Sequence, residues 1–236
     1  MEIPVYMFTG FLEGGKTKFI QGFLEDERFN TDENTLLLVC EEGIEEYEPE
    51  KFKVNNVFLE YVEDEKEICE AMLSSLQKKH KAQRVVIEMN GMWSVGNFLS
   101  EMPEGWIVYQ EMTFARASTF LAYNRNMRQQ TVEQLQGTDM LILNRADEGA
   151  DREEIHKVVR GVSRSADIAY EFADGTVEYD EIEDPQPIDI DADVIEIKDD
   201  DYAIWYRDLS EEMDKYIGKT VKFKGIVAHD DTFPKY

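Results

Sequence analysis

Near its start the chain carries residues whose types and spacing suit phosphate binding. From Gly10 to Thr17 the sequence follows the pattern G-x-x-x-x-G-K-T. In that pattern the backbone N–H groups of a glycine-rich turn and the positive end of a helix dipole converge on a phosphate chain. We expect Lys16 to reach the β- and γ-phosphates and the Thr17 hydroxyl to bind Mg²⁺. The nucleotide contacts predicted here are Gly10, Glu13, Gly14, Gly15, Lys16, Thr17 and Lys18.

A second chemical group follows an apolar, β-branched run over residues 84–89. Glu88 lies at the end of this expected strand, and Gly91 comes shortly after it. An acid at that point can hold Mg²⁺ through a water molecule or polarise the attacking water. A glycine lets its backbone N–H approach the γ-phosphate without a side chain in the way. We therefore predict that Glu88 is catalytic and a water-mediated Mg²⁺ ligand, and that Gly91 contacts the nucleotide.

A third group, Asn144-Arg145-Ala146-Asp147, directly follows an apolar run over residues 140–143. A carboxylate beyond a strand end can accept the N1–H and N2–H donors of guanine, which adenine does not offer. The asparagine amide can bond the acceptors of the base and tie neighbouring loops together. An isolated Asn-x-x-Asp is common in turns and helix caps, but after a phosphate loop and an acid-tipped strand it favours GTP. Asn144, Arg145 and Asp147 are the predicted base contacts.

Alternating strands and helices are needed to bring these groups together. Apolar runs predict strands over 3–8, 35–40, 56–61, 84–89, 106–110 and 140–143. Helical spacing predicts helices over 16–25, 65–81, 114–136 and 152–163. This order predicts an α/β, P-loop NTPase three-layer fold with a mostly parallel sheet. Ligands of such sheets bind at the carboxyl edge of the strands.

The character of the sequence changes after residue 166. Residues 168–179 predict a β-hairpin around Asp174-Gly175, and an acidic, proline-bearing connection follows over 180–193. A strand over 194–197, a helix over 209–216 and a strand over 219–227 predict a small α+β appendage. We expect a P-loop GTPase domain over residues 1–180 and this appendage over 181–236. Its last strand is expected either to begin a β module that continues beyond the chain end or to complete another sheet.

The composition excludes several classes of partner. The formal net charge is −26 at pH 7, which argues against nucleic acid and anionic membranes as partners. The two cysteines, Cys40 and Cys69, form neither a disulfide framework nor a zinc-ribbon pattern. A signal peptide and a run of ~20 apolar residues are both missing from the sequence. We expect a cytoplasmic protein without direct membrane insertion.

These motifs together resemble those of the CobW/UreG-type metallochaperone GTPases, and within them the CobW-like branch. Residues 4–12 are similar to the P-V-x-x-x-T-G-F-L entry of that branch, Glu88 to Gly91 to its E-x-x-G element, and Asn144 to Asp147 to its N-K-x-D element. The similarity covers roughly residues 3–170. It implies binding of Mg²⁺ and GTP, slow hydrolysis, nucleotide-dependent homodimerisation and delivery of a transition metal (Zn, Co or Ni) to a client protein.

The chain departs from the branch at several positions. The C-x-C-C metal motif is absent, and Cys40 replaces the asparagine of the N-E-x-G element, in which Glu41 and Gly43 match. Cys40 with its acidic neighbours is a weak candidate transition-metal ligand, and a buried strand-end cysteine is the alternative. Glu13 stands where the branch has a small residue, and we expect it to point outward. Arg145 replaces a lysine, and Lys18 replaces a threonine.

Three functions fit these observations. The first is a GTPase whose hydrolysis gates a conformational or dimer switch in metal handling or metalloprotein maturation. In it Lys16 neutralises the phosphates, while Glu88 or Glu41 orients the water. The alternative is a non-hydrolysing, nucleotide-sensing adaptor of a permease or maturation complex, which the missing thiolates and Glu13 favour. A small-molecule kinase has the same phosphate loop but would not need Asn144 and Asp147.

Overall fold

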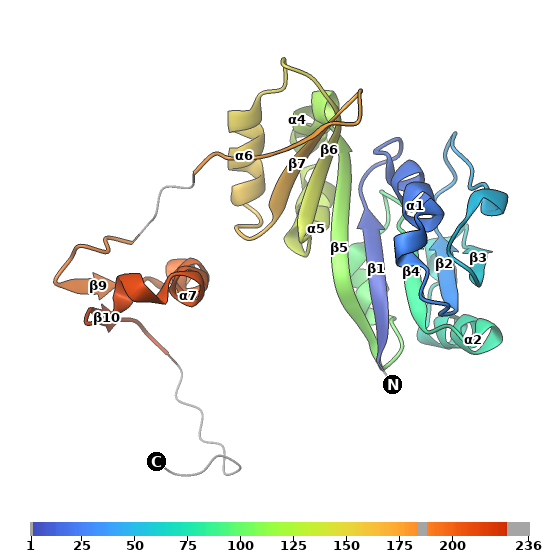
Figure 1. Ribbon diagram of the computed structural model, residues 1–236, viewed down its shortest axis with the longest axis horizontal. Coiled ribbons are helices and arrows are strands. Elements are labelled where there is room, and N and C mark those ends of the chain that lie inside the picture. The colour runs from blue at the N-terminus through green and yellow to red at the C-terminus, as the bar shows by residue number, and fades with distance from the viewer. Residues whose placement is uncertain (1, 184–187, 226–236) are drawn as a thin grey trace, which may run out of the picture. The chain divides into compact units, whose positions relative to one another are not determined.

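A large sheet runs through the N-terminal part of the chain in the computed structural model, which describes residues 2–183 and 188–225. Its strands lie side by side as Figure 1 shows, and all neighbours pair in parallel except the last two. The order across the sheet is β3 (Val57–Tyr61), β2 (Thr35–Val39), β4 (Arg84–Glu88), β1 (Ile3–Thr9), β5 (Trp106–Arg116), β6 (Met140–Ala146), β7 (Asp167–Phe172) and β8 (Val177–Tyr179). The antiparallel β7–β8 pair confirms the predicted hairpin around Asp174-Gly175.

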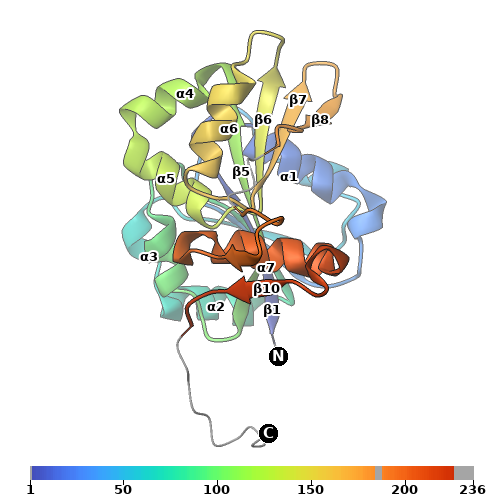
Figure 2. The ribbon, with the colours of Figure 1, turned by 90° about the vertical axis from the view of Figure 1, so that its left-hand side faces the viewer.

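Helices cover both faces of this sheet, as predicted. Figure 2 shows α1 on one side and α3, α4 and α5 on the other. The bounds are α1 (Lys16–Glu25), α2 (Glu70–His80), α3 (Val95–Ser100), α4 (Ala117–Asn126), α5 (Arg128–Gln136) and α6 (Arg152–Arg160). Alternate strand residues pack against the two layers, because side chains of a strand point to opposite faces. The α/β, three-layer prediction is therefore confirmed.

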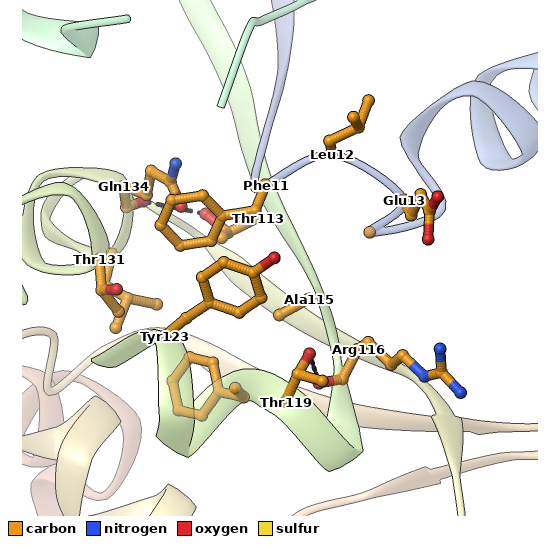
Figure 3. Close-up of a pocket in the computed structure, with 13 residues that line it drawn as sticks. Phe11, Leu12, Glu13, Thr113, Ala115, Arg116, Thr119, Tyr123, Thr131 and Gln134 are labelled. Carbon is orange, nitrogen blue, oxygen red and sulfur yellow. Dashed lines mark hydrogen bonds between the residues drawn. The ribbon is translucent and has the colours of Figure 1, made fainter. Parts of the chain in front are cut away.

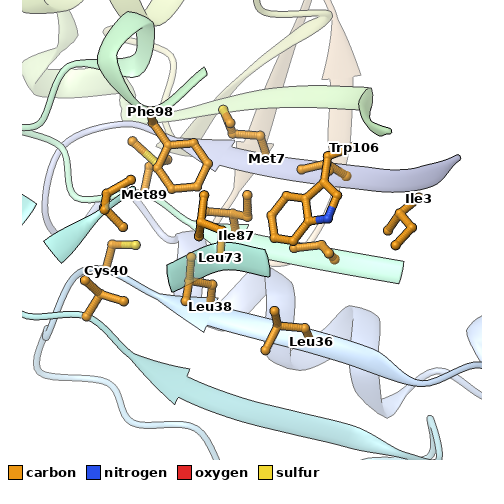
Figure 4. Packing of buried hydrophobic residues seen from close by; sticks show 14 of the residues in the cluster. Ile3, Met7, Leu36, Leu38, Cys40, Leu73, Ile87, Met89, Phe98 and Trp106 are labelled. Carbon is orange, nitrogen blue, oxygen red and sulfur yellow. The ribbon is translucent and has the colours of Figure 1, made fainter. Parts of the chain in front are cut away.

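The buried cluster on the α2 and α3 face shows how this packing positions the strand ends. Leu73 of α2 and Phe98 of α3 lie against Ile87 of β4, next to Met7 of β1 (Figure 4). Leu73, Ile87 and Met7 are fully buried. Burying a side chain of this size contributes about 1.5–3 kcal/mol, so β1 and β4 are held firmly next to each other. The phosphate loop and Glu88 leave the sheet from these two strands.

The predicted helix over residues 114–136 is wrong at both its start and its middle. Residues 114–116 extend β5, because Phe114 is buried and pairs in register with Ile142 of β6. The remainder forms two helices, α4 and α5, divided at Met127, whose φ of −133° and ψ of 49° are not helical. Helix α3 was not predicted, and the expected helix over 65–81 is a 3₁₀ turn at Glu65–Glu67 followed by α2.

The chain divides into two compact units between Ile182 and Glu183. In the C-terminal unit, β9 (Val194–Glu196) and β10 (Thr220–Lys222) form a parallel pair, which places the predicted last strand in a sheet of its own unit. The predicted helix over 209–216 lies too late in the sequence: α7 is Tyr202–Glu211, because Trp205 is buried in this unit's core. The predicted strand residues 226 and 227 lie outside the described residues.

Across residues 2–183 and 188–225, every helix is too short or too polar to cross a bilayer.

Glu111 of β5 makes the stability of the N-terminal unit depend on pH. Its side chain is 3% exposed, and its Oε1 has no hydrogen-bond partner among the described residues. Burial, with a smaller contribution from the charge of Asp139, raises its pKa to about 7 from 4.5. The folded state therefore binds a proton that the unfolded state has released. The free energy of unfolding must fall as the pH rises from about 4.5 to about 7.

Glu111→Gln removes this titration with little change in side-chain volume. We expect the variant to be more stable than the wild type at pH 8 by about 3 kcal/mol, because a rise in pKa from 4.5 to about 7 corresponds to that energy. At pH 5 the two proteins should differ little. Urea unfolding at both pH values measures this, with the exposed Glu104→Gln as control. A stability difference that does not change with pH would contradict the assignment.

Candidate nucleotide-binding site

Three loops meet at the carboxyl edge of the sheet. The phosphate loop (residues 10–17) follows β1, the post-β2 loop (residues 40–48) follows β2, and the post-β4 loop (residues 89–94) follows β4. These strands are neighbours in the order β2-β4-β1, and all three are parallel, so their loops emerge together. The sheet order therefore brings together groups that lie far apart in the sequence.

The phosphate loop has the backbone that its glycines permit. Gly10 has a φ of +121°, and a Cβ there would collide with the carbonyl oxygen of Phe114 on β5. Gly15 has a φ of +99° and directly precedes α1. Left-handed values of this kind favour glycine. No side chain caps the start of α1. The first N–H groups of a helix have no partner within the helix, so here they can donate to an anion.

Lys16 is buried beneath this loop and is fully engaged. Its ammonium donates to the carbonyl oxygens of Gly10 at 2.6 Å and Phe11 at 3.2 Å. It also forms an ion pair with Glu41 of the post-β2 loop, with Nζ and Oε2 2.6 Å apart. Lys16 is 2% exposed and Glu41 9% exposed. The lysine expected to neutralise phosphates thus has a carboxylate as its anionic partner here.

Thr17 and Glu88, the two predicted Mg²⁺ residues, are in direct contact. The Thr17 hydroxyl donates to Glu88 Oε1 at 2.6 Å, and the Tyr47 hydroxyl donates to Glu88 Oε2 at 2.5 Å. Burial raises the pKa of Glu88 above its usual range, although both hydrogen bonds act in the opposite direction. A hydroxyl and a carboxylate are oxygen donors of the type that Mg²⁺ prefers. These residues therefore fit the predicted metal.

Gly91 lies against the phosphate loop. A Cβ at this position would come within 2.6 Å of Gly10 O and Phe11 Cα, both backbone atoms. Its N–H donates to Glu41 Oε1 at 3.0 Å, and its carbonyl accepts from Nε2 of the buried Gln134 at 2.9 Å. The glycine is thus required by close packing, and its N–H points to the carboxylate that also binds Lys16.

The Asn144 element meets the phosphate loop from the other side. The Asn144 amide donates to the carbonyl oxygen of Gly14 and so ties the end of β6 to the loop. Arg145 is exposed, with a φ of +49°. Asp147 is also exposed, and its Oδ1 accepts from the Gly149 N–H at 2.9 Å.

Two adjoining pockets share Gly15, Glu45 and Arg145. The first holds the predicted phosphate residues and is lined by Leu12, Glu13, Gly14, Gly15, Lys16, Thr17, Glu41, Gly43, Ile44, Glu45, Glu88 and Arg145. The second contains Lys18, Asn144, the apolar Phe19, Phe23 and Phe172, and the polar Glu171 and Asp174. An apolar wall with a few polar groups suits a base. Asp147 is not among the described residues that line either pocket.

Glu13 is exposed at the rim of the phosphate loop and is also one of the residues that line the phosphate pocket, so its outward orientation stays a prediction. Its φ of +61° lies in the left-handed region, which explains why a glycine-like residue suits this position. Behind it, Phe11 stacks on Tyr123 of α4 with ring centroids 4.4 Å apart, inside a pocket bounded by β5, α4 and α5 (Figure 3). This aromatic pair anchors the phosphate loop to α4.

Cys40 lies in the apolar cluster between β2 and β4 rather than at the surface of the site. Burial, with the nearby charges of Glu88 and Glu41, raises the pKa of its thiol far above the usual range. Metal ions bind the thiolate, so these surroundings do not support Cys40 as a transition-metal ligand. Within the part of the chain that the structure describes, no three His, Cys, Asp or Glu residues form a group suited to a metal ion.

Sequence reasoning missed two residues of this site. Tyr47 holds Glu88 from the post-β2 loop, and Gln134 of α5 fixes the Gly91 carbonyl. Neither residue stands in a motif with a mechanism, and both reach the site only because of how the strands and helices pack. Gln134 is one of several polar residues of α5, so its residue type alone gives no signal.

Comparison with known proteins gives a likeness in fold. The structure is similar to the Zn(II)-bound YjiA GTPase from E. coli, with a TM-score of 0.51 and 18% identity, covering 71% of this chain and 57% of that one. It is also similar to the hydrogenase maturation factor HypB from Archaeoglobus fulgidus, with a TM-score of 0.51 and 15% identity, covering 73% of this chain and 82% of that one. At these identities the likeness establishes the fold alone, and the chain spans 57% of the YjiA structure.

The sequence comparisons concern the other end of the chain. Residues 176–236 match the family described as the DUF1980 C-terminal domain. No curated protein gives a significant match to the chain.

Proposed function

We propose that this chain is a Mg²⁺-dependent GTP-binding protein of CobW-like type that hydrolyses GTP. The observation that carries this proposal is the meeting of Lys16, Thr17 and Glu88 in one phosphate pocket. Gly91 is bonded to Glu41 of the same pocket, and Asn144 is bonded to the phosphate loop. The fold that the chain shares with the YjiA GTPase and with HypB supports the same function.

In the proposed mechanism each residue has a role that its position allows. Lys16 and the N–H groups at the start of α1 neutralise the phosphates, and Gly91 donates its N–H to the γ-phosphate. Thr17 would hold Mg²⁺ directly and Glu88 would hold it through a water molecule, and the ion would supply positive charge that neutralises the phosphates. Glu88 or Glu41 orients the attacking water. Tyr47 has to release Glu88 before Glu88 can orient the water, because the tyrosine hydroxyl donates a hydrogen bond to Glu88 Oε2.

The wider function is part of the same proposal. YjiA is described as a Zn(II)-bound GTPase and HypB as a hydrogenase maturation factor. We infer that hydrolysis gates a conformational or dimer switch linked to metal handling, with a client metalloprotein or permease and nucleotide-dependent homodimers as partners. The division of the chain near residue 182 supports a GTPase domain followed by a separate C-terminal domain. We propose the cytoplasm as its location.

A specific observation favours the alternative of a non-hydrolysing adaptor. All three catalytic candidates are engaged by side chains, Lys16 and Glu41 by each other and Glu88 by Tyr47. If these contacts persisted with nucleotide bound, GTP hydrolysis would be negligible. The protein would then act only by binding the nucleotide and signalling its presence to a partner.

Titration with Mg²⁺-GTP and Mg²⁺-ATP, followed by phosphate release under multiple turnover, tests the proposal. We expect GTP to bind at least about tenfold more tightly than ATP, because Asp147 accepts hydrogen bonds that only guanine donates. Phosphate should then be released in excess over enzyme, with and without Zn²⁺, Co²⁺ or Ni²⁺. Binding without multiple turnover would favour the adaptor, and equal affinities for the two nucleotides would reject the guanine assignment.

A further inference from the structure

The carboxylate of Glu41 occupies a defined place in the phosphate pocket. One of its oxygens, Oε2, accepts from Lys16 Nζ at 2.6 Å, and the other, Oε1, accepts from the Gly91 N–H at 3.0 Å. These donors belong to two different loops, which leave the sheet from β1 and β4. Glu41 itself comes from a third loop, after β2. The carboxylate therefore bridges the two donors that the proposed function assigns to the terminal phosphate.

We propose that Glu41 fills the γ-phosphate position of the resting site and sets its preference for a nucleoside diphosphate over a triphosphate. This inference rests on the proposed function. A carboxylate presents two anionic oxygens, as the exposed edge of a phosphoryl group does, and both accept charge-assisted hydrogen bonds. A diphosphate can bind beside Glu41 because its phosphates end before this position. A triphosphate has to displace it.

Electrostatic repulsion prevents the Glu41 carboxylate and a γ-phosphate from occupying this position together. The phosphate pocket is lined by four carboxylates (Glu13, Glu41, Glu45 and Glu88) and two cations (Lys16 and Arg145). A γ-phosphate next to an unmoved Glu41 would place two anions within a few ångströms of each other in a buried site, where repulsion is much stronger than in water. Binding of the triphosphate must therefore break the Lys16–Glu41 pair and the Glu41–Gly91 bond together.

Displacement of Glu41 has a structural consequence in its own loop. Tyr47 lies six residues further along the post-β2 loop and donates to Glu88, and residues 42–46 between them are all exposed. Movement of Glu41 away from Lys16 and Gly91 shifts the start of this loop and so acts on the Tyr47–Glu88 contact. The γ-phosphate would thereby make Glu88 available to Mg²⁺. In this way the loop reports which nucleotide is bound.

Glu41→Gln tests the inference through binding rather than turnover. The glutamine keeps the shape of the side chain but removes the charge that competes with the γ-phosphate. We expect the ratio of affinities for a β,γ-imido GTP analogue over GDP, both with Mg²⁺, to rise roughly tenfold compared with the wild type. Fluorescent derivatives of both nucleotides give the two dissociation constants. The exposed neighbour Glu42→Gln is the matched control and should leave the ratio unchanged.

Other results have distinct meanings. If Glu41→Gln raises both affinities equally, Glu41 only neutralises the buried Lys16, and the inference is rejected. An unchanged pair of affinities also rejects it and leaves Glu41 with a role in hydrolysis alone. If the wild type binds neither GDP nor the GTP analogue, the proposed function fails and the inference with it, which is distinguishable because the failure does not depend on the variant. Circular dichroism confirms that each variant is folded.

Discussion

Lys16→Met is expected to weaken Mg²⁺-GTP binding by on the order of a thousandfold. A buried ammonium beside a phosphate contributes about 4 kcal/mol at the effective dielectric constant of such sites, which corresponds to that factor. Lys16 is 2% exposed, so water can compensate little for the loss of its charge. Titration with a fluorescent GTP derivative measures the loss. A decrease of less than about fivefold would mean that the phosphates bind elsewhere.

The same substitution should also lower stability, because it leaves Glu41 without its cation. Removing one member of a buried ion pair costs about 3–5 kcal/mol, and the Gly91 N–H compensates only part of this. The double variant Lys16→Met/Glu41→Gln removes both charges, so we expect it to recover most of the stability in urea unfolding. Nucleotide binding should not recover. This pair of measurements separates the structural role of Lys16 from its role in binding.

Asp147→Asn is expected to change the base preference of the site from guanine to xanthine. In the proposed function the aspartate would accept two N–H donors of guanine, whereas an asparagine amide can donate to the C2 carbonyl that xanthine carries in place of the guanine amine. Loss of hydrogen bonds to a charged group costs about 1.5–3 kcal/mol, so GTP affinity should fall about tenfold to a hundredfold. Affinity for xanthosine triphosphate should rise by a similar factor. Competition with a fluorescent nucleotide measures both.

The exposed neighbour Glu148→Gln provides the control for this experiment. It removes an equal charge one residue away and should change neither affinity by more than about twofold. Asp147 already uses Oδ1 to accept from Gly149, so its Oδ2 is the oxygen with more freedom to meet a base. If Asp147→Asn and Glu148→Gln change the affinities equally, Asp147 affects nucleotide binding only through its contribution to the surface charge, and it does not contact the base.

The sequence predicted the positions whose role depends on local geometry. Gly10, Gly15 and Gly91 stand where a positive φ or a close backbone contact excludes a side chain, and such requirements leave a regular spacing in the sequence. The alternation of strands and helices was equally visible, because each apolar run has the period of its own element. These features gave the fold class and the approximate position of the phosphate loop.

The contacts between loops were not predictable, because they depend on the order of strands in the sheet. Nothing local says that β4 lies between β1 and β2, yet this order brings Glu41 to Lys16 and Tyr47 to Glu88. The error at residues 114–116 has a similar origin. Phe114 fits a helical apolar pattern, but its burial against Phe8 and its pairing with Ile142 of β6 extend the strand instead. At Met127 neither proline nor glycine marks the division between α4 and α5.

Calorimetric titration of the wild type with GTP and ATP shows whether this pocket binds a guanine nucleotide with Mg²⁺. Because four carboxylates line the phosphate pocket, we expect tight binding of GTP only with Mg²⁺ present, and much weaker binding of ATP under the same conditions. Equal affinities for GTP and ATP, or GTP binding that is unaffected by removal of Mg²⁺ with a chelator, would contradict it.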